Sequence, residues 1–333
     1  MHVTVVVPTY GNRESIFRLL DSLKYQSYKD FSLLLIYKEK KGKKEILNRI
    51  KEYEGLDIDI VIQREGLFEE ALNIEYRKAD GDICINTDDD AYAERNWIRD
   101  HVELHKIHKN IGMATGKVIE AQGEAKISRL GLFLNNQKWR MNKHTIIDRP
   151  IEKKFEDYGM YIGRSGMLVD TGRKENLIKT FKQHGVNMSW KNEALHDFKL
   201  PGYTVRGGRN EAAAALESLK RGYDAIWFNQ GLVFHPLHVS DSRGVSIHEL
   251  PKELIAESVL FAYYVKKFGE FTIDLKVLAA RNKIDRFVSS LISPSAQKWY
   301  KIGYELTRSA IMENWPPHKV REELIKRVGK EST

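Results

Sequence analysis

The chain has 333 residues, of which 42% are apolar and 30% charged, a composition that excludes a disordered or collagen-like protein. Its single cysteine, Cys84, excludes an internal disulfide and a cysteine-based zinc cluster. The net charge is +8, but residues 251–333 carry +5 of it and residues 1–250 only +3. A basic protein can bind nucleic acid, an anionic membrane or a phosphorylated substrate.

The sequence indicates a cytoplasmic protein. Residues 3–7 form a β-branched run that is too short for a secretion signal and has no basic segment before it. No run of about 18 apolar residues occurs, so we expect no membrane-spanning helix. The lone cysteine suits a reducing compartment. Peripheral attachment to the inner face of a membrane, through the basic C-terminal region, stays open.

Strand and helix signals alternate over the first 120 residues. Continuous apolar runs predict the strands, and apolar residues at helical spacing predict the helices. The predicted strands are 3–7, 31–37, 58–62, 82–86 and 112–119, and the predicted helices are 13–25, 43–53, 67–77 and 95–108. Because strands that are apolar throughout indicate a sheet covered on both faces, we expect an α/β fold with a mostly parallel, Rossmann-like central sheet flanked by helices.

The rest of the chain is less regular. We expect a strand over 128–134, a helix over 210–222 and one strand or a strand pair over 225–235, and mostly helices from 246 onward. This pattern divides the chain into a region over 1–240 and a basic, mostly helical extension over 241–333.

Three adjacent carboxylates, Asp88, Asp89 and Asp90, follow the predicted strand 82–86. They repel one another unless a cation neutralises them, and hard divalent cations prefer oxygen ligands. In extended backbone, Asp88 and Asp90 point to one side and Asp89 to the other. Parallel sheets bind ligands beyond the carboxyl ends of their strands, where residues 8–13 and 87–90 are expected. The pattern fits a metal site or, equally, a solvated acidic turn.

Several segments, taken in order, resemble family 2 glycosyltransferases of the GT-A fold. Residues 3–13 and 19–26 resemble the opening of that family, and residues 66–82 resemble the stretch that leads to its metal motif. The Asp triplet with Trp97 is similar to its Asp-x-Asp segment, and residues 185–189 to its Gly-x-Asn segment. Asn210-Glu211 falls at its Glu-Asp pair, and Val233-Phe234-His235 resembles its hydrophobic-His stop.

The resemblance covers residues 1 to about 240 and implies a GT-A nucleotide-sugar-binding and catalytic domain, with the acceptor side at about 120–240. It implies a metal-dependent, inverting glycosyltransferase that moves a sugar from a UDP or GDP sugar to a hydroxyl of a glycan, lipid-linked or small-molecule acceptor. The implied metal ligands, for Mn²⁺ or Mg²⁺, are Asp88, Asp90 and His235. The implied donor contacts are Pro8, Thr9, Tyr10, Asn12, Arg13, Tyr37, Lys38, Gly66, Asn73, Asp88 and Asp89.

The acceptor residues implied in the same way are Asn187, Trp190 and Asn210. A hydroxyl is a poor nucleophile at neutral pH, so a carboxylate must take its proton, and Glu211 is the expected catalytic base. Two positions depart from the family. Residues 37–40 replace its Asp-Asp-Gly-Ser segment, so Tyr37 becomes the expected stacking contact to the base, with Lys38 or Glu39 as a second contact. Asn210 is neutral where the family has an acid.

Two other functions stay open. The altered residues 37–40 suit a catalytically silent protein that binds sugar nucleotides or acts as a scaffold. A nucleotidyltransferase is less favoured, because residues 8–13 are a poor version of a glycine-rich phosphate loop. Basic and aromatic residues alternate over 254–301, which suits a membrane surface or helices packed on the rest of the chain. No nucleic-acid-binding motif is present, so nucleic acid is not an expected partner.

Overall fold

The computed structural model of the chain describes residues 1–10, 14–39, 45–121, 147–173, 175–236, 252–292 and 294–329. The chain divides into two compact units. The first contains residues 1–123, 175–200 and 214–238, and the second contains 124–174, 201–213 and 239–333. The described residues 147–173 and 201–213 thus fall in the same unit as the C-terminal helices, and the division at residue 240 stays a prediction. The predicted strand over 128–134 lies outside the described residues.

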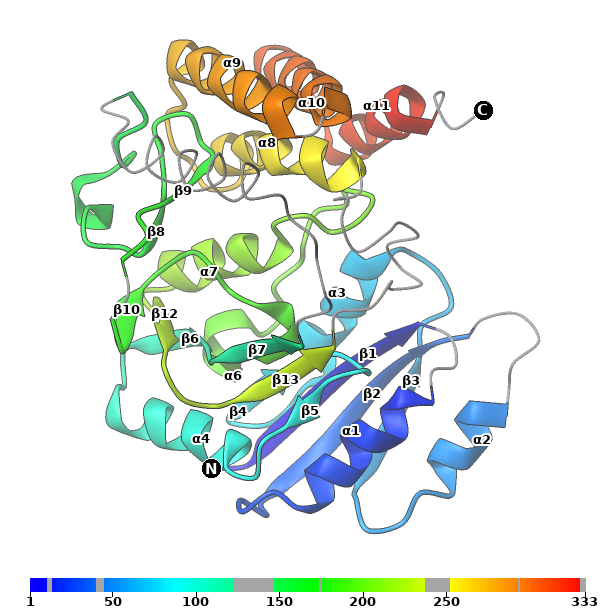
Figure 1. Cartoon of the computed structure of the whole chain (residues 1–333). Helices are drawn as coiled ribbons and strands as arrows, with labels where there is room; N and C mark the ends of the chain where they lie inside the picture. The colour runs from blue at the N-terminus through cyan, green and yellow to red at the C-terminus, as the bar shows by residue number, and fades with distance from the viewer. Residues whose placement is uncertain are drawn as a thin grey trace. The chain divides into compact units, whose positions relative to one another are not determined.

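The first unit is built on an eight-stranded sheet in the order β10-β12-β6-β11-β4-β1-β2-β3 (Figure 1). Its strands are β1 Val3–Tyr10, β2 Phe31–Lys38, β3 Ile58–Ile62, β4 Ile83–Asn86, β6 Ile111–Thr115, β10 Leu177–Lys179, β11 Met188–Lys191 and β12 Asp224–Phe228. Strand β11 is antiparallel to β4 and β6, and β10 is antiparallel to β12, whereas the other neighbours are parallel. This confirms the predicted α/β fold with a mostly parallel sheet.

Helices cover this sheet, and α1 and α2 lie together in front of β1 to β3 (Figure 1). The helices of the first unit, with α7 shared between the units, are α1 Ser15–Lys24, α2 Glu45–Lys51, α3 Phe68–Lys78, α4 Trp97–Ile107, α6 Asn192–Leu195 and α7 Asn210–Lys220. In α1, Ile16, Leu19, Leu20 and Leu23 are buried because their three- and four-residue spacing places them on one face.

The strand sequences explain the buried core. Alternate residues of β1, Val3, Val5 and Val7, pack in one cluster with α1, together with Leu33, Leu35 and Tyr37 of β2. The residues between them, such as Val6 and Leu34, are also buried. Both faces of the strands are therefore covered, which is why their sequences are apolar throughout.

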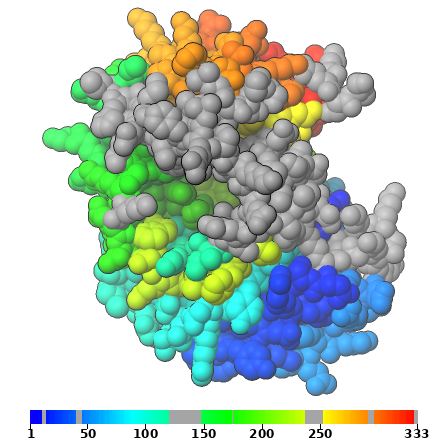
Figure 2. Space-filling view, viewed as in Figure 1, coloured from blue at the N-terminus to red at the C-terminus, as the bar shows by residue number. Residues whose placement is uncertain are grey.

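A second, three-stranded sheet has the order β5-β13-β7, with β5 Tyr92–Ala93, β7 Val118–Ala121 and β13 Val233–Pro236. The runs expected as strands over 112–119 and 225–235 each divide between the two sheets. The breaks contain Gly116 and Gly231, and a Cβ on Gly116 would lie 2.5 Å from the Gly231 carbonyl oxygen. On the surface of this unit, the yellow-green segment with β12 and β13 lies among the cyan segments that follow β4 (Figure 2).

In its described residues, the second unit contains a β-hairpin and four α-helices. The hairpin pairs β8 Met160–Ile162 with β9 Leu168–Asp170, and the helices are α8 Lys252–Lys267, α9 Leu275–Ile292, α10 Pro294–Met312 and α11 Pro317–Gly329. Helix α10 contacts α8, α9 and α11. This confirms the helical C-terminal region, and most of the apolar side chains of α8 are buried. Among the described residues, the helices are too short or too polar to cross a membrane.

Candidate metal centre

Asp88, Asp90 and His235 come together in the first unit. Nε2 of His235 lies 3.2 Å from Oδ1 of Asp90 and 3.5 Å from Oδ2 of Asp88. One ligand atom from each of the three lies within 4.8 Å of the others. The two aspartates follow β4, whereas His235 lies on β13 of the three-stranded sheet. The grouping expected from the sequence is thus present.

Asp89 points to a different partner, as the alternation of side chains predicts. Its carboxylate accepts a hydrogen bond from the Thr9 hydroxyl, and both side chains are buried. Strands β1 and β4 are parallel, with Val6 opposite Asn86, so the residues beyond them emerge at the same edge of the sheet. The backbone amide of Thr87 also donates to the Val6 carbonyl, at 3.1 Å. Thr9 and Asp89 therefore hold the acidic turn in place.

The donor set of these three residues fits a hard divalent cation. Two carboxylates and one imidazole provide oxygen and nitrogen ligands, and carboxylates with water suit Mg²⁺ and Mn²⁺. The Asp90 side chain is only 6% exposed, whereas Asp88 is 41% and His235 19% exposed. Ionised carboxylates this close repel one another, so a bound cation would stabilise the group, and the exposed side leaves room for further ligands.

A second group of residues, expected from the sequence to contact the donor, lies near the carboxyl ends of β1 and β2. The Lys38 ammonium donates a hydrogen bond to the Gly66 carbonyl and lies 5.8 Å from the centre of the Tyr10 ring. The Tyr10 side chain is 47% exposed. Gly66 has φ of +79°, a backbone conformation that favours glycine. An exposed aromatic ring and a cation thus lie side by side.

Tyr37 lies in the core rather than at this surface. It is fully buried among the residues packed on α1, and burial raises the pKa of its hydroxyl. Its inward position follows from alternation along β2, where Lys38 points the other way. In the described structure, Tyr10 rather than Tyr37 offers a ring to a ligand. Pro8 is part of β1 and half-buried, and Asn12 and Arg13 lie outside the described residues.

Asn73 joins two segments of the first unit. Its side-chain amide donates to the Leu200 carbonyl at 3.3 Å, and its side-chain oxygen accepts from the Leu200 amide at 2.8 Å. The side chain is only 7% exposed. Through these paired bonds, Asn73 holds the backbone at Leu200, which is a structural role. The contact with the sugar-nucleotide donor expected from the sequence stays a prediction.

Asn187 is fully buried at the centre of a hydrogen-bond network. Its side-chain oxygen accepts from Trp97 Nε1 at 2.8 Å and lies 3.0 Å from His101 Nε2. Its side-chain nitrogen donates to the carbonyls of Lys117 and Gly231, at 2.9 and 2.6 Å. Because Lys117 precedes β7 and Gly231 precedes β13, Asn187 connects the two sheets at their shared break. Its contacts are those of a core residue.

Trp190 is also buried, and its ring packs edge-on against Tyr76 at 5.6 Å between centroids. Trp190 is only 1% exposed and Asn187 is fully buried, so a direct contact with an acceptor stays a prediction for both. Strand β11, which carries Trp190, was not expected as a strand. Its four residues are too few to show periodicity in the sequence. Its strand conformation becomes evident only from its pairing with β4 and β6 on either side.

Two buried histidines of α4 extend this network. His101 Nδ1 and His105 Nε2 lie 2.8 and 2.9 Å from the Ser189 hydroxyl. Burial lowers the pKa of His101 to about 4 and that of His105 to about 3, so both are neutral near pH 7. The sequence analysis did not single out these residues, because their i, i+4 spacing on an amphipathic helix is ordinary for core positions.

Asn210 and Glu211 begin α7, as expected, and they belong to the second unit with residues 201–213. Asn210 is buried, and Glu211 is half-buried in the first turn of the helix. Arg209, just before them, has φ of +73° and Gly207 has φ of +77°. Glu211 is thus the acidic residue of the first turn of α7.

Comparison with known proteins identifies related sequences and folds. Residues 4–165 match the model of a family described as glycosyl transferase family 2. A search of curated protein sequences gave no match.

Similar solved structures include the mannosyltransferase PcManGT from Pyrobaculum calidifontis in complex with GDP-Man and Mn²⁺, at 16% identity and a TM-score of 0.53, covering 97% of this chain and 85% of that one. S. aureus TarS 1–349 with UDP-GlcNAc is similar at 12% identity and 0.53, covering 99% and 92%. GalNAc-T7 with UDP, GalNAc and Mn²⁺ is similar at 14% identity and 0.54, covering 100% and 58%. At these identities the likeness shows a shared fold.

Proposed function

We propose a metal-assisted sugar transfer for this chain, a glycosyltransferase whose residues 4–165 match the model of glycosyl transferase family 2. The observation that carries the proposal is the group formed by Asp88, Asp90 and His235. The two aspartates lie within the matched segment, directly after β4, and the histidine lies on β13. The donor would be a nucleotide-diphosphate sugar with UDP or GDP, the class named for the similar mannosyltransferase and TarS structures.

Asp88, Asp90 and His235 would hold Mn²⁺ or Mg²⁺. Such a cation supplies Lewis-acid stabilisation of the diphosphate as it leaves. The Thr9 hydroxyl and Asp89 would keep the acidic turn in register, because their hydrogen bond joins the ends of β1 and β4. Tyr10 and Lys38 would contact the nucleotide base, the ring by stacking and the ammonium by donating hydrogen bonds.

Glu211 would be the general base. Its carboxylate would take the proton of the acceptor hydroxyl while that oxygen bonds to the anomeric carbon and the bond to the diphosphate breaks. This single displacement inverts the configuration at that carbon, as the family resemblance implies. The support for Glu211 is its place in the sequence and in the first turn of α7.

A thermal-shift panel tests the donor and the metal. UDP and GDP sugars, each with and without Mn²⁺ or Mg²⁺, should raise the melting temperature when metal and donor are both present, because a ligand that binds only the native state stabilises it. Absence of a shift with every sugar nucleotide would contradict the proposed donor class. A shift without turnover would favour a binding or scaffold protein instead.

Substitution of Glu211 tests the base. Glu211→Gln should lower kcat by about 100-fold or more, the usual contribution of a general base, and leave donor binding unchanged. Glu217→Gln on the same helix is the matched control, since Glu217 pairs with Arg221 at 2.8 Å. Wild-type turnover in Glu211→Gln would refute the role of Glu211.

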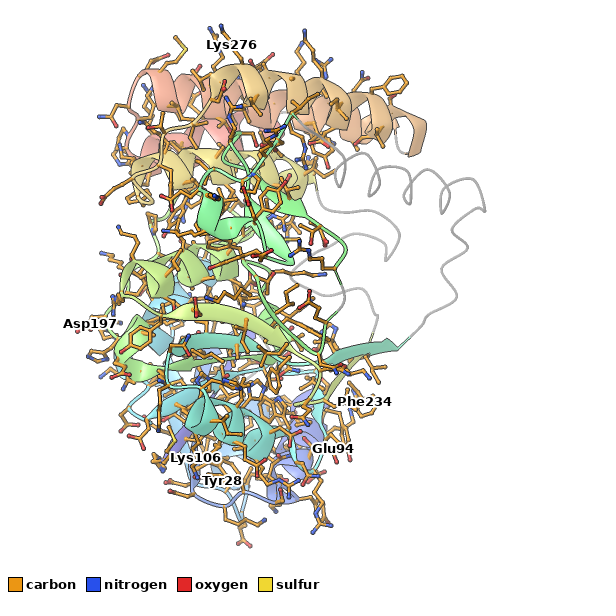
Figure 3. All side chains as sticks on the ribbon, turned by 90° about the vertical axis from the view of Figure 1, so that its left-hand side faces the viewer. Tyr28, Glu94, Lys106, Asp197, Phe234 and Lys276 are labelled. Atoms are coloured by element: carbon orange, nitrogen blue, oxygen red, sulfur yellow. The ribbon has the colours of Figure 1, made fainter. Side chains whose placement is uncertain are left out.

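We also propose a glycan or lipid-linked acceptor reached at the inner face of a membrane. On α9, the exposed residues Lys276 (labelled in Figure 3), Lys283 and Phe287 recur at seven- and four-residue spacing and so share one face. Phe287 is 62% exposed. A basic face with an aromatic residue suits an anionic lipid surface.

Co-sedimentation with phosphatidylserine vesicles at low salt tests the membrane proposal. The wild-type chain should sediment with these vesicles, and the double variant Lys276→Glu with Lys283→Glu should sediment much less. Equal sedimentation of the two proteins would refute it. Neutral phosphatidylcholine vesicles are the control for non-specific pelleting.

A further inference from the structure

Within the second unit, one buried carboxylate of the C-terminal helices holds the segment that leads to Glu211. Glu257 lies in the middle of α8 and has no exposed surface. Its Oε1 atom accepts hydrogen bonds from the backbone amides of Val205 and Arg206, at 2.6 and 2.9 Å. Its Oε2 atom accepts from the amide of Gly208, at 2.8 Å.

Three amide donors explain how this carboxylate can be buried. Burial raises the pKa of Glu257, and the three hydrogen bonds counteract that effect, because they favour the charged form. A buried carboxylate without such partners would be strongly destabilising. The rigid helix α8 thereby fixes three of the four consecutive backbone amides of residues 205–208.

The approach between this segment and α8 is close. A Cβ added to Gly208 would lie 2.7 Å from Oε2 of Glu257 and 2.9 Å from its Cβ. Gly207 and Arg209, on either side, have positive φ, and a non-glycine residue such as Arg209 adopts this conformation only where its surroundings impose it. The backbone thus turns sharply just before Asn210 and Glu211.

Further contacts with α8 hold the chain before and after residues 205–208. The Tyr203 ring stacks on that of Tyr264, with centroids 5.8 Å apart and planes at 25°. The Tyr264 hydroxyl lies 3.4 Å from the carbonyl oxygen of Ala213, which follows Glu211 in α7. Glu253 lies 3.9 Å from Arg206, which is a weak contact compared with the three bonds of Glu257.

We propose that Glu257 is a positioning residue that sets the orientation of Glu211 by fixing the backbone of residues 205–208. This inference rests on the proposed function, since it takes Glu211 as the general base. It gives the C-terminal helices a part in sugar transfer that is separate from any membrane contact. The carboxylate is needed because three amides converge on it and only an ionised group accepts from all of them without offering a donor.

The test uses the full chain with Glu257→Gln, Glu257→Asp and, as matched control, Glu253→Gln. The first assay measures hydrolysis of the UDP or GDP sugar that the thermal-shift panel selects, with Mn²⁺ and water as the acceptor. The second measures amide hydrogen exchange over residues 204–213. Gly208→Ala provides an independent variant, because the added methyl group pushes the same segment away without altering the carboxylate.

In Glu257→Gln and Gly208→Ala, we expect kcat to fall by about 10-fold to 100-fold at unchanged KM for the sugar nucleotide, since a displacement of about 1 Å at a catalytic group costs up to about 100-fold. Exchange over 204–213 should accelerate while the rest of the chain keeps its protection. Glu257→Asp should recover part of kcat, and Glu253→Gln should match the wild type.

Wild-type kcat in Glu257→Gln, or unchanged exchange over 204–213, would overturn the proposal. A loss of protection throughout the chain, matched in Gly208→Ala, would also overturn it by showing a general structural role. If the wild-type chain hydrolyses no sugar nucleotide, the proposed function fails, and hydrogen exchange alone then decides whether Glu257 holds the segment.

Discussion

Nε2 of His235 lies 3.2 Å from Oδ1 of Asp90, although Asp90 follows β4 of the central sheet and His235 lies on β13 of the small sheet. The chain passes from the central sheet to the small sheet at Gly231, between β12 and β13, and at Gly116, between β6 and β7. The neighbouring Phe234 (labelled in Figure 3) is 38% exposed and contacts the ring of Tyr92 across β13 and β5. The metal group is thus assembled where two sheets meet.

Removal of one ligand should weaken metal binding. We expect Asp90→Asn or His235→Gln to weaken Mn²⁺ binding by about 10-fold or more, because each deletes a direct ligand atom (one order of magnitude is about 1.4 kcal/mol). The measurement is titration calorimetry with Mn²⁺ alone. Asp82→Asn is the control, since Asp82 lies at the opposite end of β4 and accepts from the backbone amide of His2. Equal affinity in all variants would place the metal elsewhere.

Changes beside β1 and β2 should affect the donor rather than the metal. Tyr10→Ala and Lys38→Ala should each weaken binding of the sugar nucleotide by about 10-fold, through loss of an aromatic contact and of a cationic donor. Their affinity for Mn²⁺ alone should stay at the wild-type value. Lys29→Ala is the control, because the ammonium of this exposed lysine donates to the Lys24 carbonyl, away from Tyr10 and Lys38 in the sequence. A donor affinity equal to that of the wild type would remove Tyr10 and Lys38 from the donor site.

Truncation of Asn187 should destabilise the first unit. Asn187→Ala removes the hydrogen-bond partner of the Trp97 indole and of the Gly231 carbonyl, and each buried unsatisfied group costs about 1–3 kcal/mol. The Lys117 carbonyl still accepts from the Val233 amide in this variant. We expect a loss of about 3 kcal/mol in the free energy of unfolding, measured in urea. Gln183→Ala, a buried amide with two longer bonds of 3.2 and 3.3 Å, should cost clearly less. A loss no larger than that of the control would contradict the bridging role.

Stability should fall as the pH drops below about 6.5. The pKa of His101 is lowered from 6.5 to about 4 and that of His105 to about 3, so the unfolded chain binds more protons than the folded chain in this range. Each pKa unit corresponds to about 1.4 kcal/mol, so the shift of His101 alone corresponds to about 3 kcal/mol. This stability is fully present above pH 6.5 and is lost as the pH falls towards 4.

Urea unfolding at several pH values between 7.5 and 4.5 measures this dependence. His105→Asn should unfold at lower urea concentration near pH 7 but lose less stability on acidification than the wild type, because one buried neutral imidazole is gone. The difference in slope between the two proteins isolates His105 from the other titrating groups. Identical slopes would show that His105 does not take up a proton on unfolding.

The sequence by itself determined the α/β class and most elements of the first 110 residues. Strands such as β2, expected over 31–37, match because nearly continuous apolar runs between amphipathic helices indicate a parallel sheet covered on both faces. It also predicted that Asp88 and Asp90 lie on one side of the turn after β4, because side chains alternate in extended backbone, and the structure groups them with His235. The helical C-terminal region followed from its apolar spacing.

Only the tertiary structure decided which expected residues face a ligand. Burial depends on what packs against a strand, so Tyr37 lies in the core beside exposed Tyr10, and Asn187 and Trp190 are enclosed by β4, β6 and α4. The short strand β11 has no periodicity of its own and exists through its neighbours. The hold of Glu257 on residues 205–208 joins segments far apart in the chain, and backbone amides, which carry no sequence signal, are its partners.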